Sequence, residues 1–108
     1  MGKASRSKGN TGELEVRRLY EAHGFTVRGL EGAGDHLALG HGLTIFSEVK
    51  RCERWEVQEW LRQTWTEAPN STLPVLALRG NRWPWVAAVP LDSLLGSLTR
   101  EFRTFERA

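Results

Sequence analysis

The sequence predicts one α/β domain in which helices pack against a β-sheet of mixed strand direction. A helical pattern of apolar residues opens the chain, three strand-like segments follow, and a second helical pattern separates them from a further strand pair. With a short helix near the end, the order is α-β-β-β-α-β-β-α. A chain of 108 residues has room for a single domain with one modest core.

The first helix is predicted over residues 11–25, the segment TGELEVRRLYEAHGF. Thr11 suits the N-cap position and Gly24 suits the C-terminal end. Four residues at i, i+3, i+4 and i+7 predict one buried face, made of Val16, Leu19, Tyr20 and His23. Glu13 and Glu15 border this face on its two sides. Either can bring a carboxylate to the edge of the core, and Glu13 is favoured.

Three strands are predicted next. Residues 25–28 form a short one, which leads into a glycine-rich turn. Residues 36–39 and 43–50 form two more, and the intervening Gly-His-Gly suits the turn of a hairpin.

The hairpin brings three charged residues together. Side chains alternate along a strand, so Glu48 and Lys50 share one face. A turn centred near His41 sets Asp35 across from about Ser47 or Glu48, and cross-strand neighbours lie about 5 Å apart. Asp35, Glu48 and Lys50 are therefore predicted to converge at the end of the hairpin.

The second half of the chain continues the alternation. A helix is predicted over residues 55–68, ended by Pro69. Its apolar stripe consists of Val57, Trp60, Leu61, Thr64 and Trp65. A strand pair within residues 73–89 turns at Gly80-Asn81, and a short helix capped by Asp92 leads into a helical or frayed tail.

Composition narrows the class of protein. The net charge is +2, with basic residues concentrated in residues 1–10 and 50–54, as expected for a protein that binds a polyanion. Residues 1–10 are predicted to form a mobile basic arm. Cys52 is the only cysteine, which fits a reducing compartment. No apolar run reaches membrane-spanning or signal-peptide length, so a cytoplasmic location is expected, in the host cell if the source is viral.

The spacing of the charged residues, D-x12-E-x-K, suggests phosphodiester chemistry. A phosphodiester repels nucleophiles, and a divalent metal held by carboxylates neutralises that charge and activates water. Lys50 beside the carboxylates can orient the water or stabilise charge on the phosphate. In the plainer interpretation, Glu48 and Lys50 are a charge pair on a solvated strand and Asp35 is a turn residue. The predicted convergence on one face favours the chemical interpretation.

These residues resemble the PD-(D/E)XK nuclease superfamily and, more narrowly, the archaeal and phage Holliday-junction resolvases. The resemblance covers about residues 8–65. It falls on Lys8, Gly9, Glu13, Gly24, Phe25, Arg28, Asp35, Glu48, Lys50 and Gln63. Gly34 stands where the superfamily's name has proline, and the loop between Arg28 and Asp35 is short.

The resemblance implies a restriction-endonuclease-like mixed sheet flanked by helices and a homodimer that cleaves four-way DNA junctions. It implies that Mg²⁺, or Mn²⁺, is held by Glu13, Asp35, Glu48 and the carbonyl of Val49, and that Lys50 assists the attacking water. No membrane and no small-molecule substrate are expected.

The basic segments and the resemblance together suggest where DNA is contacted. The predicted contacts are Lys3, Arg6, Lys8, Arg28, Arg51, Arg54 and Gln63. Two alternatives stay open: a nuclease of the same fold with a nicking, repair or restriction-type substrate, and a DNA-binding module without activity. Aromatic residues beyond the predicted core supply a candidate dimer surface, namely Trp55, Trp83, Trp85, Phe102 and Phe105.

Overall fold

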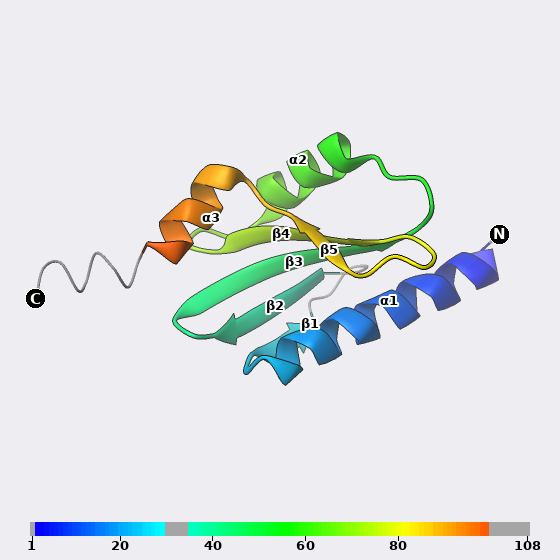
Figure 1. Ribbon diagram of the computed structural model, residues 1–108, viewed down its shortest axis with the longest axis horizontal. Helices are drawn as coiled ribbons and strands as arrows, with labels where there is room; N and C mark the ends of the chain where they lie inside the picture. The colour runs from blue at the N-terminus through cyan, green and yellow to red at the C-terminus, as the bar shows by residue number, and fades with distance from the viewer. Residues whose placement is uncertain (1, 30–34, 100–108) are drawn as a thin grey trace, which may run out of the picture.

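The computed structural model describes residues 2–29 and 35–99, with side chains for residues 11–29 and 36–99 (Figure 1). Its elements are α1 (Gly2–Ala22), β1 (Thr26–Gly29), β2 (Asp35–Gly40), β3 (Leu43–Arg51), α2 (Val57–Glu67), β4 (Leu73–Arg79), β5 (Val86–Ala88) and α3 (Leu91–Leu98). The predicted α-β-β-β-α-β-β-α order is confirmed.

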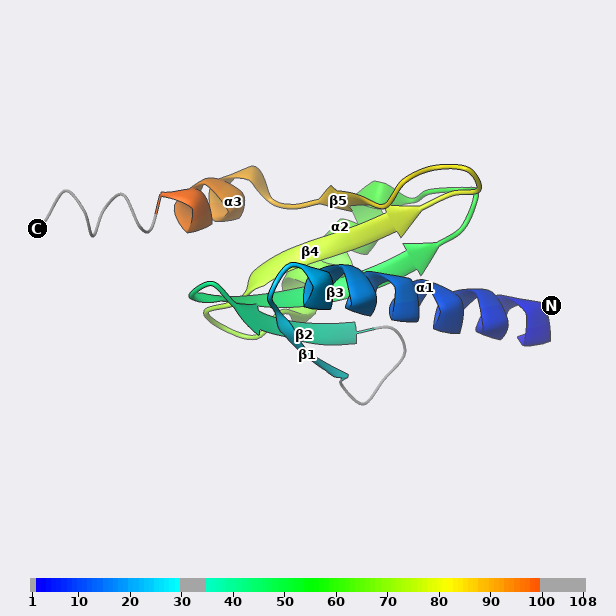
Figure 2. The same cartoon turned by 60° about the horizontal axis from the view of Figure 1, so that its bottom comes forward.

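The strands form one mixed sheet in the order β1-β2-β3-β4-β5. The β3–β4 pair is parallel, and the other neighbouring pairs are antiparallel. Helix α1 crosses one face of the sheet and α2 lies behind the other, while α3 lies at the end of the sheet where β4 begins (Figure 2). The α/β class with helices packed on a mixed sheet is therefore confirmed.

The hydrophobic core under α1 is continuous across four strands. One cluster consists of Val27, Ala38, Ile45 and Val75, and a second consists of Val16, Val49 and Ala77. Tyr20 joins both and donates a hydrogen bond of 3.0 Å to Ser47 Oγ. At Gly12, an added Cβ would lie 3.2 Å from Cβ of Arg51, so the absent side chain lets α1 approach the end of β3.

The opposite face is covered by α2. Phe46, Leu76 and Leu78 are buried there, and Thr64 is the fully buried residue of α2. Thr64 Oγ1 donates to the carbonyl of Trp60 at 2.7 Å, which satisfies the hydroxyl within its own helix.

The hairpin is confirmed, and the starts of all three helices are corrected. His41 and Gly42 adopt positive φ angles of 51° and 72° between β2 and β3, as a tight turn requires. Helix α1 begins at Gly2 instead of Thr11, and the residues before Thr11 contain no proline that would interrupt it. Helix α2 begins at Val57 instead of Trp55. Asp92 is not the cap of α3: it lies in the first turn, after Pro90.

The predicted helix faces are partly wrong. Leu19 and His23 are exposed, because the contact face of α1 runs through Gly12, Val16 and Tyr20. Trp65 is exposed as well, since it lies about 100° around α2 from buried Thr64, beyond the side that the sheet covers.

No helix within residues 2–29 and 35–99 combines the length and the hydropathy needed to cross a bilayer.

Candidate functional site

The strand register places Asp35 directly opposite Glu48, so one of the two predicted pairings is confirmed. The Asp35 side chain lies outside the described residues. Glu48 is nearly buried, with 12% of its side chain exposed, and Lys50 Nζ lies 3.7 Å from Glu48 Oε1. The structure therefore brings Glu48 and Lys50 together on one strand face, with the backbone of Asp35 on the neighbouring strand.

Lys50 is also held by an aromatic ring. Its Nζ lies 5.5 Å from the ring centroid of Trp60 in α2, within the range of a cation–π contact. Together with the Glu48 carboxylate, this ring restricts the ammonium group to a defined place at the edge of the α2 face. Trp60 is a predicted core residue, but its contact with Lys50 is not visible from the sequence.

The third predicted carboxylate, Glu13, lies on the helix that covers the other face. Helix α1 packs on the side of β3 that carries Ser47 and Val49, whereas Glu48 points to the α2 side. Because neighbouring Gly12 packs on Arg51, Glu13 lies near the end of β3 but not across the strand from Glu48. Glu13 has no hydrogen bond or ion pair to the rest of the described chain.

Glu15, the other acidic candidate, has two structural partners. Its carboxylate forms ion pairs with Arg51 of β3 and Arg79 of β4. These arginines are partners in the parallel strand register. Arg79 is a participant that sequence reasoning missed, because only the strand pairing shows that it lies beside Arg51.

Val49 has its side chain in the core under α1, and its backbone pairs with Ala77 of β4. Its carbonyl as a metal ligand stays a prediction. Among the side chains that the structure describes, no three His, Cys, Asp or Glu residues gather closely enough to hold a metal. The Asp35 carboxylate is not among those side chains.

The predicted DNA contacts are distributed over several elements. Arg28 of β1 is exposed, and its register through Leu37 to Phe46 places it on the Glu48 face. Arg54 is exposed in the turn after β3. Gln63 is exposed on α2, where it donates to Glu67 at 3.2 Å.

The remaining predicted contacts differ in their surroundings. Arg51 is half-buried and held by Glu15 on the α1 side, so its guanidinium already has a partner within the chain. Lys3, Arg6 and Lys8 fall within α1, whose backbone includes residues 2–10 of the predicted arm, but their side chains lie outside the described residues, and the mobility of the arm stays a prediction.

The three tryptophans of the predicted dimer surface that the structure describes do not form one shared patch. Trp83 and Trp85 precede β5, so they do not alternate as on a strand. Trp85 packs against the core under α1, whereas Trp83 packs edge to face with Trp55, at 6.0 Å between ring centroids. Phe102 and Phe105 lie outside the described residues.

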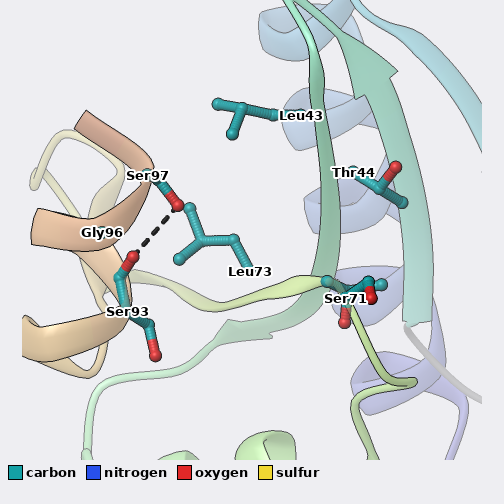
Figure 3. A pocket seen from close by; sticks show the side chains of 8 residues that line it. Leu43, Thr44, Ser71, Leu73, Ser93, Gly96 and Ser97 are labelled. Carbon is teal, nitrogen blue, oxygen red and sulfur yellow. Dashed lines mark hydrogen bonds between the residues drawn. The ribbon is translucent and has the colours of Figure 1, made fainter. Parts of the chain in front are cut away.

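The apolar side of helix α3 faces away from the sheet. Ser93, Gly96 and Ser97 lie on the side turned toward Leu73, where they line a hollow of about 270 Å³ (Figure 3). The opposite side exposes a stripe of large apolar residues, Leu91, Leu95 and Leu98. This stripe has no cover within the described part of the chain.

Comparisons with protein-family models, with curated proteins and with solved structures find no match to this chain.

Proposed function

We propose that this protein is a metal-dependent endonuclease of the restriction-endonuclease-like fold that hydrolyses branched DNA, most of all four-way junctions. The observation that carries the proposal is the pairing of Asp35 with Glu48 across β2 and β3, with Lys50 Nζ 3.7 Å from the Glu48 carboxylate. A nearly buried glutamate beside a lysine on one strand, opposite an aspartate on the neighbouring strand, is unusual for a solvated charge pair.

The donor set suits a hard divalent cation. Two carboxylates, from Asp35 and Glu48, stand against the single ammonium of Lys50, so the group keeps an excess of negative charge. Carboxylate and carbonyl oxygens are the ligands that Mg²⁺ prefers, and Mn²⁺ accepts the same set. Asp35, Glu48 and the carbonyl of Val49 would hold the ion, with Glu13 as a further carboxylate. A bound Mg²⁺ would neutralise phosphate charge and lower the pKa of a coordinated water.

Lys50 supplies the positive charge that the chain itself brings to the reaction. Hydrolysis adds water across a P–O bond, which leaves a phosphate monoester and a free hydroxyl. Negative charge grows on the non-bridging oxygens as the water attacks, and an ammonium held in place stabilises that charge without reorganising. The contacts of Lys50 with Glu48 and Trp60 provide this fixed placement.

We propose a homodimer, because resolving a four-way junction requires two cuts related by approximate two-fold symmetry. A two-fold dimer repeats one active site across a matching axis. The outward stripe of α3 supports an interface there, since Leu91, Leu95 and Leu98 are spaced four and three residues apart. Such spacing is typical of a helical seam that pairs with its own copy. In the sequence the same spacing continues to Phe102 and Phe105, which lie outside the described residues.

The test is cleavage by the purified protein of junction, duplex and single-stranded DNA, with Mg²⁺, with Mn²⁺ and with chelator. We expect metal-dependent cleavage with preference for the junction. Asp35→Asn and Glu48→Gln should abolish cleavage, because each removes an anionic metal ligand. Junction binding should be kept or improved, because the variant has one negative charge fewer and therefore repels the phosphates less. Glu59→Gln is the matched control, since this carboxylate is exposed on α2 and pairs with Arg62.

Three results would contradict the proposal. Near wild-type cleavage by Asp35→Asn or Glu48→Gln would show that the site is wrongly assigned. Equal cutting of duplex and junction would identify another kind of nuclease. Junction binding without cleavage under either metal would identify a DNA-binding module.

A further inference from the structure

The turns that follow β3 and β4 lie side by side at one end of the strands. The two parallel strands end at the same level, where Arg51 is paired with Arg79. Beyond that pair, Cys52 N donates to the Arg79 carbonyl at 3.0 Å, and the Asn81 N–H donates to the Glu53 carboxylate. Glu48 lies three residues before this end, which is about 10 Å of extended strand.

These two turns hold a pair of tryptophans in fixed orientations. Trp55 Nε1 donates to the Cys52 carbonyl at 2.7 Å. The backbone carbonyl of Trp83 accepts a hydrogen bond from Arg79 Nε at 2.7 Å, and the backbone N–H of Trp83 donates to the Gly80 carbonyl at 3.3 Å. The two rings meet edge to face at an angle of 63°, so each ring restrains the other.

The rings border an open hollow of about 300 Å³, lined by Glu53, Trp55, Gly80 and Trp83. Trp83 is 58% exposed despite its anchored backbone and its ring partner. A large ring that is exposed and also held in place loses little conformational entropy when a flat group stacks on it. Nucleobases are such groups, and stacking on aromatic side chains tolerates any base.

The positive charges around the hollow fit a nucleic-acid strand. Arg54 and Arg82 are exposed on the two turns, and Lys50 is the last residue of β3 on the face that carries Glu48. Cations placed around an aromatic surface bind the phosphates on either side of a stacked base. The one carboxylate in the lining, Glu53, already accepts from the Asn81 N–H.

We infer that Trp83, braced by Trp55, is a stacking platform for an unpaired nucleobase next to the proposed cleavage site. That the ligand is DNA rests on the proposed function. The platform would give the protein a preference for DNA in which a base at a branch point is unpaired and no longer stacked in the duplex. Such a platform recognises the distorted shape of the substrate without reading its sequence.

The test is DNA binding by the full-length protein in chelator, so that no cleavage is required. The probe is a duplex with one unpaired 2-aminopurine, whose fluorescence falls when the base stacks on an aromatic ring. We expect Trp83→Ala to raise the Kd for this probe by about five- to a hundredfold, the range of one base–aromatic stack. The variant should also abolish the quenching, and Trp83→Phe should restore most of it.

Trp65→Ala is the matched control, because Trp65 is 61% exposed on α2, and it should change neither Kd nor quenching. The fully paired duplex should bind Trp83→Ala as tightly as wild type. If wild type binds the probe and Trp83→Ala has the same Kd and quenching, the platform is refuted and the proposed nuclease is not. If wild type binds no DNA, the proposed function fails and the platform with it. If Trp83→Ala instead changes the mass of the free protein, the rings form a subunit contact and the inference is overturned.

Discussion

Glu15 and Arg79 are 64 residues apart in the sequence, and their side chains form an ion pair that joins α1 to β4. The second oxygen of Glu15 lies 3.7 Å from Arg51 Nε. Since Arg51 and Arg79 are neighbours in the parallel register, the negative charge of the Glu15 carboxylate offsets the repulsion between the two guanidinium groups. These three residues connect the first helix to the strand end that carries the candidate site.

Removing the Glu15 charge should destabilise the fold. We expect Glu15→Gln to lower the free energy of unfolding by about 1–2 kcal/mol, less than for a fully buried pair because these side chains are about a quarter exposed. Urea unfolding measures the change. Glu21→Gln, which breaks the exposed Arg17–Glu21 pair, is the control and should change stability by less than about 0.5 kcal/mol. Equal effects of the two variants would show that the Glu15 pairs are not structural.

Lys50→Ala should slow single-turnover cleavage by about 10²–10³-fold, the usual effect of losing one preorganised electrostatic group. Metal affinity, measured by calorimetry, should change little, since lysine is not a ligand. A variant that no longer binds metal would show that Lys50 supports the carboxylates instead of the reaction.

Trp60 should act as a positioning residue for Lys50. Trp60→Leu removes the ring 5.5 Å from Nζ and should slow cleavage several-fold, the value of one partly exposed cation–π contact. Trp60→Phe keeps an aromatic face and should recover part of the rate. The double variant Lys50→Ala, Trp60→Leu should be no slower than Lys50→Ala alone. Additive losses in the double variant would contradict a role through Lys50.

Tyr20 should make stability sensitive to alkaline pH. Burial raises the pKa of its phenol, and the hydrogen bond with Ser47 opposes part of that rise. The folded state therefore disfavours the ionised phenol. Its contribution to stability is fully present below about pH 10, the usual pKa of an unfolded tyrosine, and is lost as the pH rises toward the higher folded value.

Tyr20→Phe removes this group and should flatten the loss of stability above about pH 10, as measured by urea unfolding across pH. At neutral pH the variant should be about 1 kcal/mol less stable, because the fully buried Ser47 hydroxyl loses its partner. An unchanged alkaline slope would assign the effect to other groups.

The stripe on α3 should hold the proposed dimer together. Light scattering of the wild-type protein should give about twice the 12.2 kDa monomer mass, and Leu95→Glu should give the monomer because it places a charge in the seam. Leu14→Glu, at an exposed leucine of α1, is the control and should stay dimeric. A wild-type monomer that cuts both strands of a junction without dimerising on it would contradict this model.

The order of the elements and the hairpin register follow from local signals. Period-2 alternation predicts the strands, and the short Gly-His-Gly turn narrows the partner of Asp35 to Ser47 or Glu48, of which the structure shows Glu48. The contact of Lys50 with Glu48, and the place of Asp35 on the neighbouring strand, could be predicted for the same reason, since all three residues belong to one hairpin. The helix faces were less predictable. Leu19 and Trp65 lie on apolar stripes and are still exposed, because the width of the sheet decides how much of a stripe is covered.

Sequence alone therefore determined the α/β class, the hairpin, and the placing of Asp35 on the strand beside Glu48 and Lys50, because neighbours in a hairpin are set by chain connectivity. Only the tertiary structure decided which residues from distant elements meet there. Trp60 lies against Lys50 because α2 packs on that face, and Trp83 meets Trp55 because β3 and β4 run parallel and end together. Parallel pairing joins segments across a long connection, so no local pattern in the sequence specifies those contacts.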